Sequence, residues 1–297
     1  MKSGIIVLRK EEGITSQGAV NRIKRLFSVK KAGHTGTLDP LATGVLPVLI
    51  GRAVKASEYM LTSDKHYKAT LRLGITTDTE DITGTILSEN YEIPDEATVI
   101  KTISGFVGEI MQTPPMYSAL KVGGKKLCDL ARDGIEIERE PRAVTVHSID
   151  VRKIDGARYS LDVHCSKGTY IRTLCADIGK HLGCGGVMET LERTKASVFT
   201  LDEAHTLSEI EAMTDSERES IIIPVERVFD KYEAVSLQPF FARLARCGLE
   251  IYLHKIGISL DEGVLVRLYD GEDFFALGEV RSFDTGLAIK PIKQFDL

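Results

Sequence analysis

The chain has 297 residues, 43% of them hydrophobic, and a formal net charge of −5. This length predicts one large domain and one small one, and the apolar content is sufficient for a buried core, which excludes a wholly disordered protein. No apolar run reaches the roughly 18 residues of a membrane-spanning helix. Since the N-terminus also lacks the apolar core of a signal peptide, we expect a cytoplasmic protein.

The spacing of the cysteines and the distribution of charge exclude further classes of protein. Five cysteines occur without any CxxC pair, which argues against a zinc site and a disulfide framework and predicts reduced, mostly buried thiols. Residues 1–60 contain ten Lys or Arg and four acids, whereas residues 202–233 contain ten acids and three bases. The basic segment can bind phosphate, although two ordinary solvated surfaces would give the same pattern.

The first half of the chain predicts mixed strands and helices. A short apolar run predicts a buried strand at residues 4–9, and apolar residues at helical spacing predict a helix capped by Thr15 or Ser16. A glycine-rich loop occupies residues 32–44. The elements expected after it are an apolar segment at 45–50, a helix at 53–61, a strand at 67–73, an acidic turn at 78–84, a strand at 85–87 and a helix at 95–106.

The second half contains an insertion and a strand-rich tail. Residues 112–142 include Pro-Pro and Gly-Gly pairs and little apolar periodicity, so we expect a protruding insertion with one short helix. The Gln238-Pro239 pair predicts a boundary, beyond which about 60 residues suffice for a small barrel-like β module. The other expected elements are antiparallel strands at 144–151 and 159–165, a helix at 169–182, and short strands at 264–269, 274–277 and 287–289.

The segment Gly33–Gly44, GHTGTLDPLATG, is the most informative part of the sequence. Its glycines allow tight backbone paths, and its one carboxylate, Asp39, precedes Pro40, which disfavours helix and lets the side chain project from a stiff support. The GxxxxGK[ST] pattern of a phosphate-binding loop is absent. From residue types alone, an ordinary turn aspartate and a hydrogen-bonded loop histidine, His34, remain alternatives to a catalytic site.

The run GHTGTLDPLATGVLPVLIG closely resembles the first motif of the TruB family of tRNA pseudouridine synthases. The resemblance continues, in the family's order, over about the first 200 residues, and the tail resembles the PUA RNA-binding module that many members carry. The further motifs are DKHY at 64–67, RLG at 72–74, TDT at 77–79, QTPPMYSALK at 112–121, CSKGTYIR at 165–172 and LERT at 191–194.

The resemblance implies roles for individual residues. Asp39 corresponds to the catalytic aspartate, Tyr67 to the tyrosine stacked on the target base, and Arg172 to the arginine paired with the aspartate. The implied substrate-binding residues are His34, which fills the space vacated by the flipped base, Leu191, which walls the pocket, and Lys10, Lys121 and Arg193. No metal and no cofactor is implied.

The chemistry of the implied reaction suits these residue types. Pseudouridine formation breaks the C1′–N1 bond, turns the uracil and rejoins it through C5, so neither a redox change nor a group donor is needed. An ionised Asp39 can attack C1′ or stabilise a cationic sugar, and a route through proton removal at C2′ stays open. Arg172 would favour the charged carboxylate and fix its orientation, and the Tyr67 ring would stack on the extruded base.

Residues 112–142 resemble the family's thumb, which closes over the RNA stem-loop. Its bases would contact phosphates, although nearby acids nearly balance them, as in an ordinary solvated loop; these bases are Lys121, Lys125, Lys126 and Arg132. Three residues depart from the family pattern, since Glu11 stands for a proline, Cys128 for a tyrosine and Glu192 for an arginine. Glu11 leaves open the position of the adjacent Lys10, and Glu192 leaves open one contact with RNA.

Pattern and resemblance together predict an α/β protein of the α+β type, with a mixed, mainly antiparallel sheet flanked by helices. The expected catalytic domain covers residues 1–236 and the PUA-like domain residues 237–297. The expected substrate is the T-arm of tRNA, at the T-loop uridine of position 55 in tRNA numbering, and the expected enzyme is a monomer without an obligate protein partner. Two alternatives are a guide-RNA-dependent synthase of the same superfamily and a non-catalytic tRNA-folding chaperone.

Overall fold

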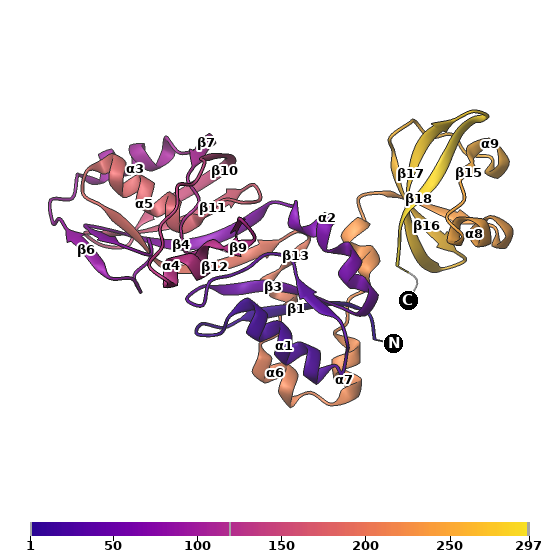
Figure 1. The fold of residues 1–297 in the computed structure, drawn as a ribbon, viewed down its shortest axis with the longest axis horizontal. Coiled ribbons are helices and arrows are strands. Elements are labelled where there is room, and N and C mark those ends of the chain that lie inside the picture. The colour runs from indigo at the N-terminus through magenta and orange to yellow at the C-terminus, as the bar shows by residue number, and fades with distance from the viewer. Residues whose placement is uncertain (1, 119, 296–297) are drawn as a thin grey trace.

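The computed structural model describes residues 2–118 and 120–295. Figure 1 shows a large unit built on one long sheet and a smaller C-terminal unit with its own sheet. The longest helix, α5 (Ile171–Leu182), has 12 residues, and among the described residues no helix is both long and apolar enough to span a bilayer.

The large sheet runs in the order β1-β3-β12-β4-β11-β10-β7, with β2 paired to β3 and β13 to β12. All its pairs are antiparallel except β3 and β12, which run parallel. The expected mixed, mainly antiparallel sheet is therefore confirmed. The strands are β1 (Gly4–Lys10), β2 (Ala32–His34), β3 (Thr43–Ile50), β4 (Lys65–Leu73), β7 (Gly108–Gln112), β10 (Arg142–Lys153), β11 (Arg158–Cys165), β12 (Gly186–Ala196) and β13 (Phe199–Thr200).

One face of the sheet is covered by α1 (Ser16–Leu26), α3 (Glu96–Ser104) and α5. Strand β4 contributes to this core through alternate residues, Ala69, Leu71 and Leu73, as its sequence pattern predicts. Thr15 caps α1 by accepting a hydrogen bond from the Gly18 amide, which confirms one of the two expected caps. The predicted strands at the N-terminus and around residue 155 are likewise present as β1, β10 and β11.

The opposite face carries a second core that reaches into the C-terminal unit. Phe229 contacts Phe274 and Phe295 with ring-centre distances of 6.0 and 5.3 Å, so the two units share buried aromatic contacts. The expected helix at 53–61 forms as a 3₁₀ turn followed by a short α-helix. The elements around this core are η1 (Gly51–Ala56), α2 (Ser57–Leu61), η2 (Leu201–Glu203) and η3 (Val225–Phe229). Helix α6 (Leu207–Ala212) packs in the first core instead, and α7 (Asp215–Ser220) has no buried residue.

The C-terminal unit is a five-stranded sheet in the order β14-β16-β17-β18-β15. Its first strand begins at Glu233 and pairs in parallel with β16, so the expected boundary at 236–237 falls within this strand. Helix α8, which the sequence pattern did not indicate, begins at Pro239 and packs against the sheet. The elements are β14 (Glu233–Leu237), α8 (Pro239–Arg246), β15 (Ile251–Tyr252), α9 (Leu253–Ile256), β16 (Leu265–Asp270), β17 (Asp273–Phe283) and β18 (Gly286–Gln294).

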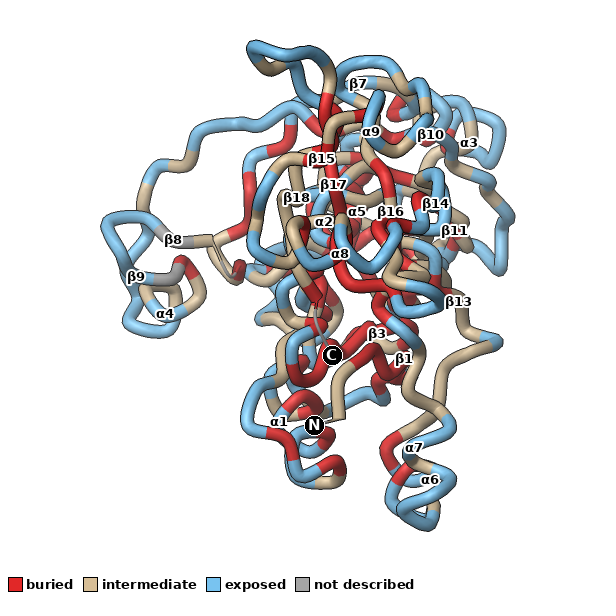
Figure 2. Tube along the Cα trace, turned by 90° about the vertical axis from the view of Figure 1, so that its right-hand side faces the viewer, coloured by how far each residue is buried: buried red, intermediate tan, exposed pale blue. Residues whose placement is uncertain are grey.

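The segment between β7 and β10 projects from the body of the large unit, as the tube in Figure 2 shows at the left. It contains the hairpin β8 (Lys121–Val122) and β9 (Lys125–Lys126) and the short helix α4 (Leu127–Arg132). A second small hairpin, β5 (Ile75–Thr77) and β6 (Ile86–Glu89), follows β4, and all four residues of β6 are exposed.

Candidate active site

The loop that carries Asp39 connects β2 to β3 and is held by backbone contacts on both sides of that residue. The Ser16 hydroxyl accepts a hydrogen bond from the Leu38 amide (2.8 Å) and donates one to the Leu38 carbonyl (2.9 Å). On the other side, the fully buried Lys10 ammonium donates to the Pro40 carbonyl at 3.2 Å and to that of Ala42. The backbone beneath Asp39 is therefore fixed before any ligand binds.

Arg172, the second residue of α5, meets the Asp39 carboxylate side-on. Its Nε lies 3.0 Å from Oδ2 and its Nη2 3.4 Å from Oδ1, which is the planar two-point geometry that guanidinium offers and ammonium cannot. Its remaining N–H groups donate to the carbonyls of Thr79 (3.1 Å) and Tyr117 (2.7 Å). Only 5% of the Arg172 side chain is exposed, against 33% for Asp39, so the carboxylate still faces solvent.

A second carboxylate, Asp81, lies on the far side of the same guanidinium, with Oδ2 3.7 Å from Arg172 Nη1. The pKa of Asp39 is raised above its ordinary value, chiefly because burial disfavours the charge, and Asp81 adds to that shift while Arg172 and Lys10 oppose it. Burial also lowers the pKa of Lys10 to about 8. The site thus holds a carboxylate whose ionisation is costly.

Tyr67 lies on β4 opposite Arg193 of β12. Burial raises the pKa of the Tyr67 hydroxyl; the adjacent Arg193 guanidinium opposes this shift, and the charge of Asp39 adds to it. Arg193 is 1% exposed and donates to the carbonyls of Val45 (2.8 Å) and Gly36 (3.1 Å), so it ties the Asp39 loop and β3 to the central strand. The structure thereby brings Asp39, Tyr67, Arg172, Lys10 and Arg193 together.

Gly44 explains how β3 and β12 approach so closely. Its φ is +102°, and a Cβ added there would lie 2.3 Å from the Arg193 carbonyl oxygen. Only glycine permits both this backbone conformation and this contact. The last glycine of the motif is therefore required by the junction that carries Arg193.

His34 and Leu191 occupy the edges of the same region. His34 is half-buried on β2, its Nδ1 has no hydrogen-bond partner among the described residues, and burial together with Arg193 lowers its pKa. Leu191 is 8% exposed on β12 and packs in the main core. The lowered pKa of His34 favours the uncharged imidazole at this position.

The projecting segment contributes few described cations. The side chain of Lys121 lies outside the described part of the chain, as does that of Lys126, while Arg132 is exposed and 3.5 Å from Asp129. Of the three departures from the family pattern, Glu192 pairs with Arg9 at 3.1 Å. The carbonyl of Glu11 accepts a hydrogen bond from Lys10, and Cys128 is partly buried.

Sequence reasoning missed three residues that position the site. Ser16 was considered only as a helix cap, Asp81 lies just beyond the TDT motif, and Gln112 was taken as the start of the insertion. The Gln112 side chain bonds both the amide (2.9 Å) and the carbonyl (3.0 Å) of Tyr170, which directly precedes α5. Ser16 and Gln112 act on backbone that is distant in sequence, and Asp81 lies beside the side chain of the distant Arg172. Only the burial of these polar side chains reveals such roles.

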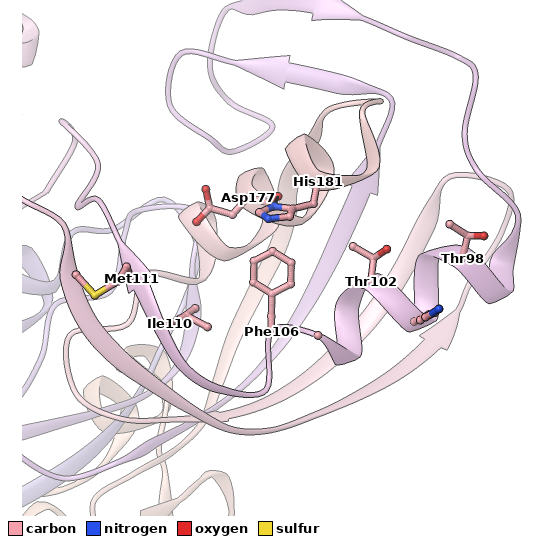
Figure 3. A pocket seen from close by; sticks show the side chains of 9 residues that line it. Thr98, Thr102, Phe106, Ile110, Met111, Asp177 and His181 are labelled. Carbon is pink, nitrogen blue, oxygen red and sulfur yellow. Dashed lines mark hydrogen bonds between the residues drawn. The ribbon is translucent and has the colours of Figure 1, made fainter.

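An open cavity of about 770 Å³ lies elsewhere, between α3, β7 and α5. Figure 3 shows Phe106 and His181 at its centre, and their rings meet edge to face at 5.1 Å. None of the residues lining it carries the Asp39 carboxylate or its partners; they are Thr98, Lys101, Thr102, Gly105, Phe106, Ile110, Met111, Asp177 and His181. This cavity is separate from the candidate active site.

Two family models match the chain. Residues 24–171 match the TruB family pseudouridylate synthase N-terminal domain, and residues 172–230 match the tRNA pseudouridylate synthase B C-terminal domain. The matches divide the chain between Ile171 and Arg172, within the catalytic unit rather than at the start of the small sheet.

Curated relatives and solved structures agree with these matches. A protein from Clostridium tetani named tRNA pseudouridine synthase B is 40% identical to this chain, over 93% of this chain and 95% of its own length. A protein of the same name from Burkholderia pseudomallei is 43% identical, over 96% of this chain and 95% of its own length. Among solved structures, Cbf5 in a Cbf5-Nop10-Gar1 complex is 27% identical with a TM-score of 0.70, covering 98% of this chain and 84% of its own. A chain of an H/ACA RNP bound to a substrate RNA is 25% identical with a TM-score of 0.72, and the match covers 99% of this chain and 85% of the other.

Proposed function

We propose that this chain, which belongs to the TruB family of pseudouridylate synthases, is an isomerase that converts a uridine of tRNA to pseudouridine. The target is the T-loop uridine at position 55, and the enzyme acts as a cytoplasmic monomer.

Asp39 is the catalytic carboxylate. The observation that carries this assignment is the combination of a rigid loop, a side-on contact with the buried Arg172, and one third of the carboxylate side chain still exposed. An oriented anion of this kind can attack C1′ or stabilise the cationic sugar as the C1′–N1 bond breaks. It can equally remove a proton from C2′, and both routes need Asp39 ionised.

The neighbouring residues suit an extruded base. The Tyr67 ring would stack on the uracil, which contributes about 1–3 kcal/mol towards the few kcal/mol that extrusion costs. His34, half-buried on β2, would fill the space that the departed base leaves in the RNA. Lys121 and the rest of the projecting segment would close over the stem-loop, and the C-terminal sheet would serve as a PUA-like RNA-binding module.

The test is incubation of an unmodified T-arm stem-loop with the purified chain, followed by nucleoside analysis. Wild type should form pseudouridine, and Asp39→Asn should form none while binding the stem-loop with unchanged affinity. Asp150→Asn, an exposed aspartate on β10, is the matched control and should remain active. Product from Asp39→Asn would reject the catalytic assignment, and retained tRNA folding without any product from wild type would favour the chaperone.

The structural likeness to Cbf5 favours a guide-RNA-dependent synthase as the second candidate. The same assay separates the two, because the stem-loop is supplied without guide RNA or accessory proteins. Turnover under these conditions excludes a requirement for either, and turnover only after their addition would support the second candidate.

A further inference from the structure

Three of the seven histidines of the chain gather on one face of the large sheet, next to a carboxylate. His66 of β4 stacks on His164 of β11 at 4.0 Å, and His147 of β10 lies 4.5 Å from His164. Asp64 directly precedes β4. Because successive strand residues point to opposite faces, His66 lies on the face opposite Tyr67, away from Asp39.

A bulge in β10 directs His147 into this group. The register with β11 shifts between Val146 and Ser148, so His147 is the extra residue of the bulged strand. Bulges of this kind re-aim a side chain at a local cost in sheet pairing. The shift sets both His147 and Ser148 opposite His164, and the His147 ring lies beside that of His164.

The donor atoms have the spacing of a tetrahedral metal site. Asp64 Oδ2 lies 3.2 Å from His147 Nε2 and 3.6 Å from His164 Nε2, and the three atoms lie within 4.8 Å of one another. A zinc ion with bonds of about 2.0–2.1 Å to nitrogen and oxygen has ligand-to-ligand distances of about 3.3–3.4 Å. The two measured distances lie on either side of that value.

Ion pairing alone gives little reason for the arrangement. The three side chains are 48%, 36% and 32% exposed, and pairs at that exposure contribute about 0–1 kcal/mol. Two imidazoles that share one carboxylate oxygen would repel each other if both were protonated. Neutral imidazoles that bind one cation together with the carboxylate remove that conflict, because each then presents a lone pair.

The site also faces open space. A cavity of about 430 Å³ is lined by Asp64, His66 and His164 together with two cations, Lys195 and Lys231. Two of the three ligands, Asp64 and His164, border this cavity, so a fourth tetrahedral position on that side is free for water or an exogenous ligand. The lysines would favour an anion there.

We propose that Asp64, His147 and His164 bind a divalent transition metal, best matched by Zn²⁺, with the fourth position open to this cavity. His66 supports the site from outside by stacking on His164. The ion links β10, β11 and the turn before β4, on the face opposite the candidate active site. This proposal is independent of the proposed function, since metal binding is measured without RNA.

The test is a Co²⁺ titration of the tag-free full chain, followed by displacement with Zn²⁺. We expect one equivalent of Co²⁺ to give the visible absorption of a tetrahedral site, and Zn²⁺ to abolish it. His147→Ala, His164→Ala and Asp64→Asn should each weaken binding by at least about tenfold, because loss of even outer-sphere partners costs 10–100-fold. His254→Ala, an exposed histidine in the C-terminal unit, is the matched control and should bind as wild type does.

Thermal unfolding gives an independent readout. Metal at 100 times its dissociation constant should increase the folding equilibrium constant about 100-fold in wild type and much less in the three ligand variants. Asp64→Asn keeps the size of the side chain, so it tests the site even if a histidine variant folds poorly. Absence of a tetrahedral spectrum, or equal affinity in Asp64→Asn, His254→Ala and wild type, overturns the proposal.

Discussion

Removal of the Ser16 hydroxyl is the sharpest test of how the fold positions Asp39. Ser16 is 2% exposed, and its hydroxyl is the partner of both backbone groups of Leu38, the residue directly before Asp39. In Ser16→Ala these two groups lose their partner, and Leu38 is itself only 3% exposed. The variant therefore loosens one side of the loop without touching the carboxylate or Arg172.

The expected loss of stability follows from those two contacts. A buried backbone group left without a partner costs about 1–3 kcal/mol, so the two together cost at least about 2 kcal/mol. For a chain of this size that lowers Tm by at least about 3 °C, and the total stability of about 5–15 kcal/mol leaves the variant folded at 25 °C. A displacement of about 1 Å at the reacting group can cost about 100-fold, so kcat should fall by about 10–100-fold.

Thr15→Ala is the matched control, because it removes a hydroxyl from the adjacent residue. Thr15 is exposed and caps α1 through the Gly18 amide, and among the described residues its hydroxyl makes no hydrogen bond to the Asp39 loop. Its removal should cost about 1 kcal/mol of stability. We expect kcat of Thr15→Ala to stay within about twofold of wild type when both are measured at 25 °C with saturating T-arm stem-loop.

The comparison separates positioning from stability. If Ser16→Ala loses the expected stability but retains the kcat of Thr15→Ala, the contact with Leu38 does not orient the carboxylate. A defect confined to KM would likewise contradict the reasoning, because the hydroxyl is buried beneath the loop and does not reach the substrate.

Three further predictions follow from the same contacts. Arg172→Lys should lower kcat by about 100-fold with little change in stem-loop affinity, because an ammonium cannot make both contacts with Asp39; equal kcat would make the planar pairing unnecessary. Asp81→Asn should shift the acid limb of the pH–rate profile to lower pH, because the negative charge at this position raises the Asp39 pKa and its removal lowers it; a shift to higher pH would refute this. Gly44→Ala should lower Tm by at least about 3 °C, whereas Gly123→Ala, also at positive φ but with open space around it, should lower Tm less. Equal losses of Tm would show that the backbone conformation, not the contact with β12, causes the destabilisation.

The strands with regular alternation could be predicted from the sequence. In β4, apolar residues at 69, 71 and 73 alternate with polar ones, and burial follows that pattern. The helices α1, α3 and α5 were similarly indicated by apolar spacing, and each begins within two residues of its expected position. These elements depend on local contrast between one buried face and one exposed face.

The central strand β12 could not be predicted in this way. Its sequence, GVMETLERTKA, mixes acids and bases with few apolar residues, which is typical of an exposed segment. Yet the strand lies between β3 and β4, and its Arg193 is among the most buried side chains. The guanidinium is tolerated there because the carbonyls of Gly36 and Val45 accept its hydrogen bonds. Those partners lie about 150 residues away along the chain. The local pattern of apolar residues therefore cannot predict them.

The raised pKa of Asp39 accounts for the many buried polar contacts of the site. The pKa of Asp39 is higher in the folded protein than in the unfolded chain, so the folded state binds its proton more tightly. The stability contributed by this group is therefore present at acid pH and lost as pH rises through the raised pKa, which means that an ionised Asp39 opposes folding. The contacts of Ser16 and Lys10 with the loop backbone and of Arg172 with the carboxylate offset part of that cost. Burial disfavours the charged form of Asp39. An ionised carboxylate at this position therefore interacts strongly with a positive charge that develops on the sugar.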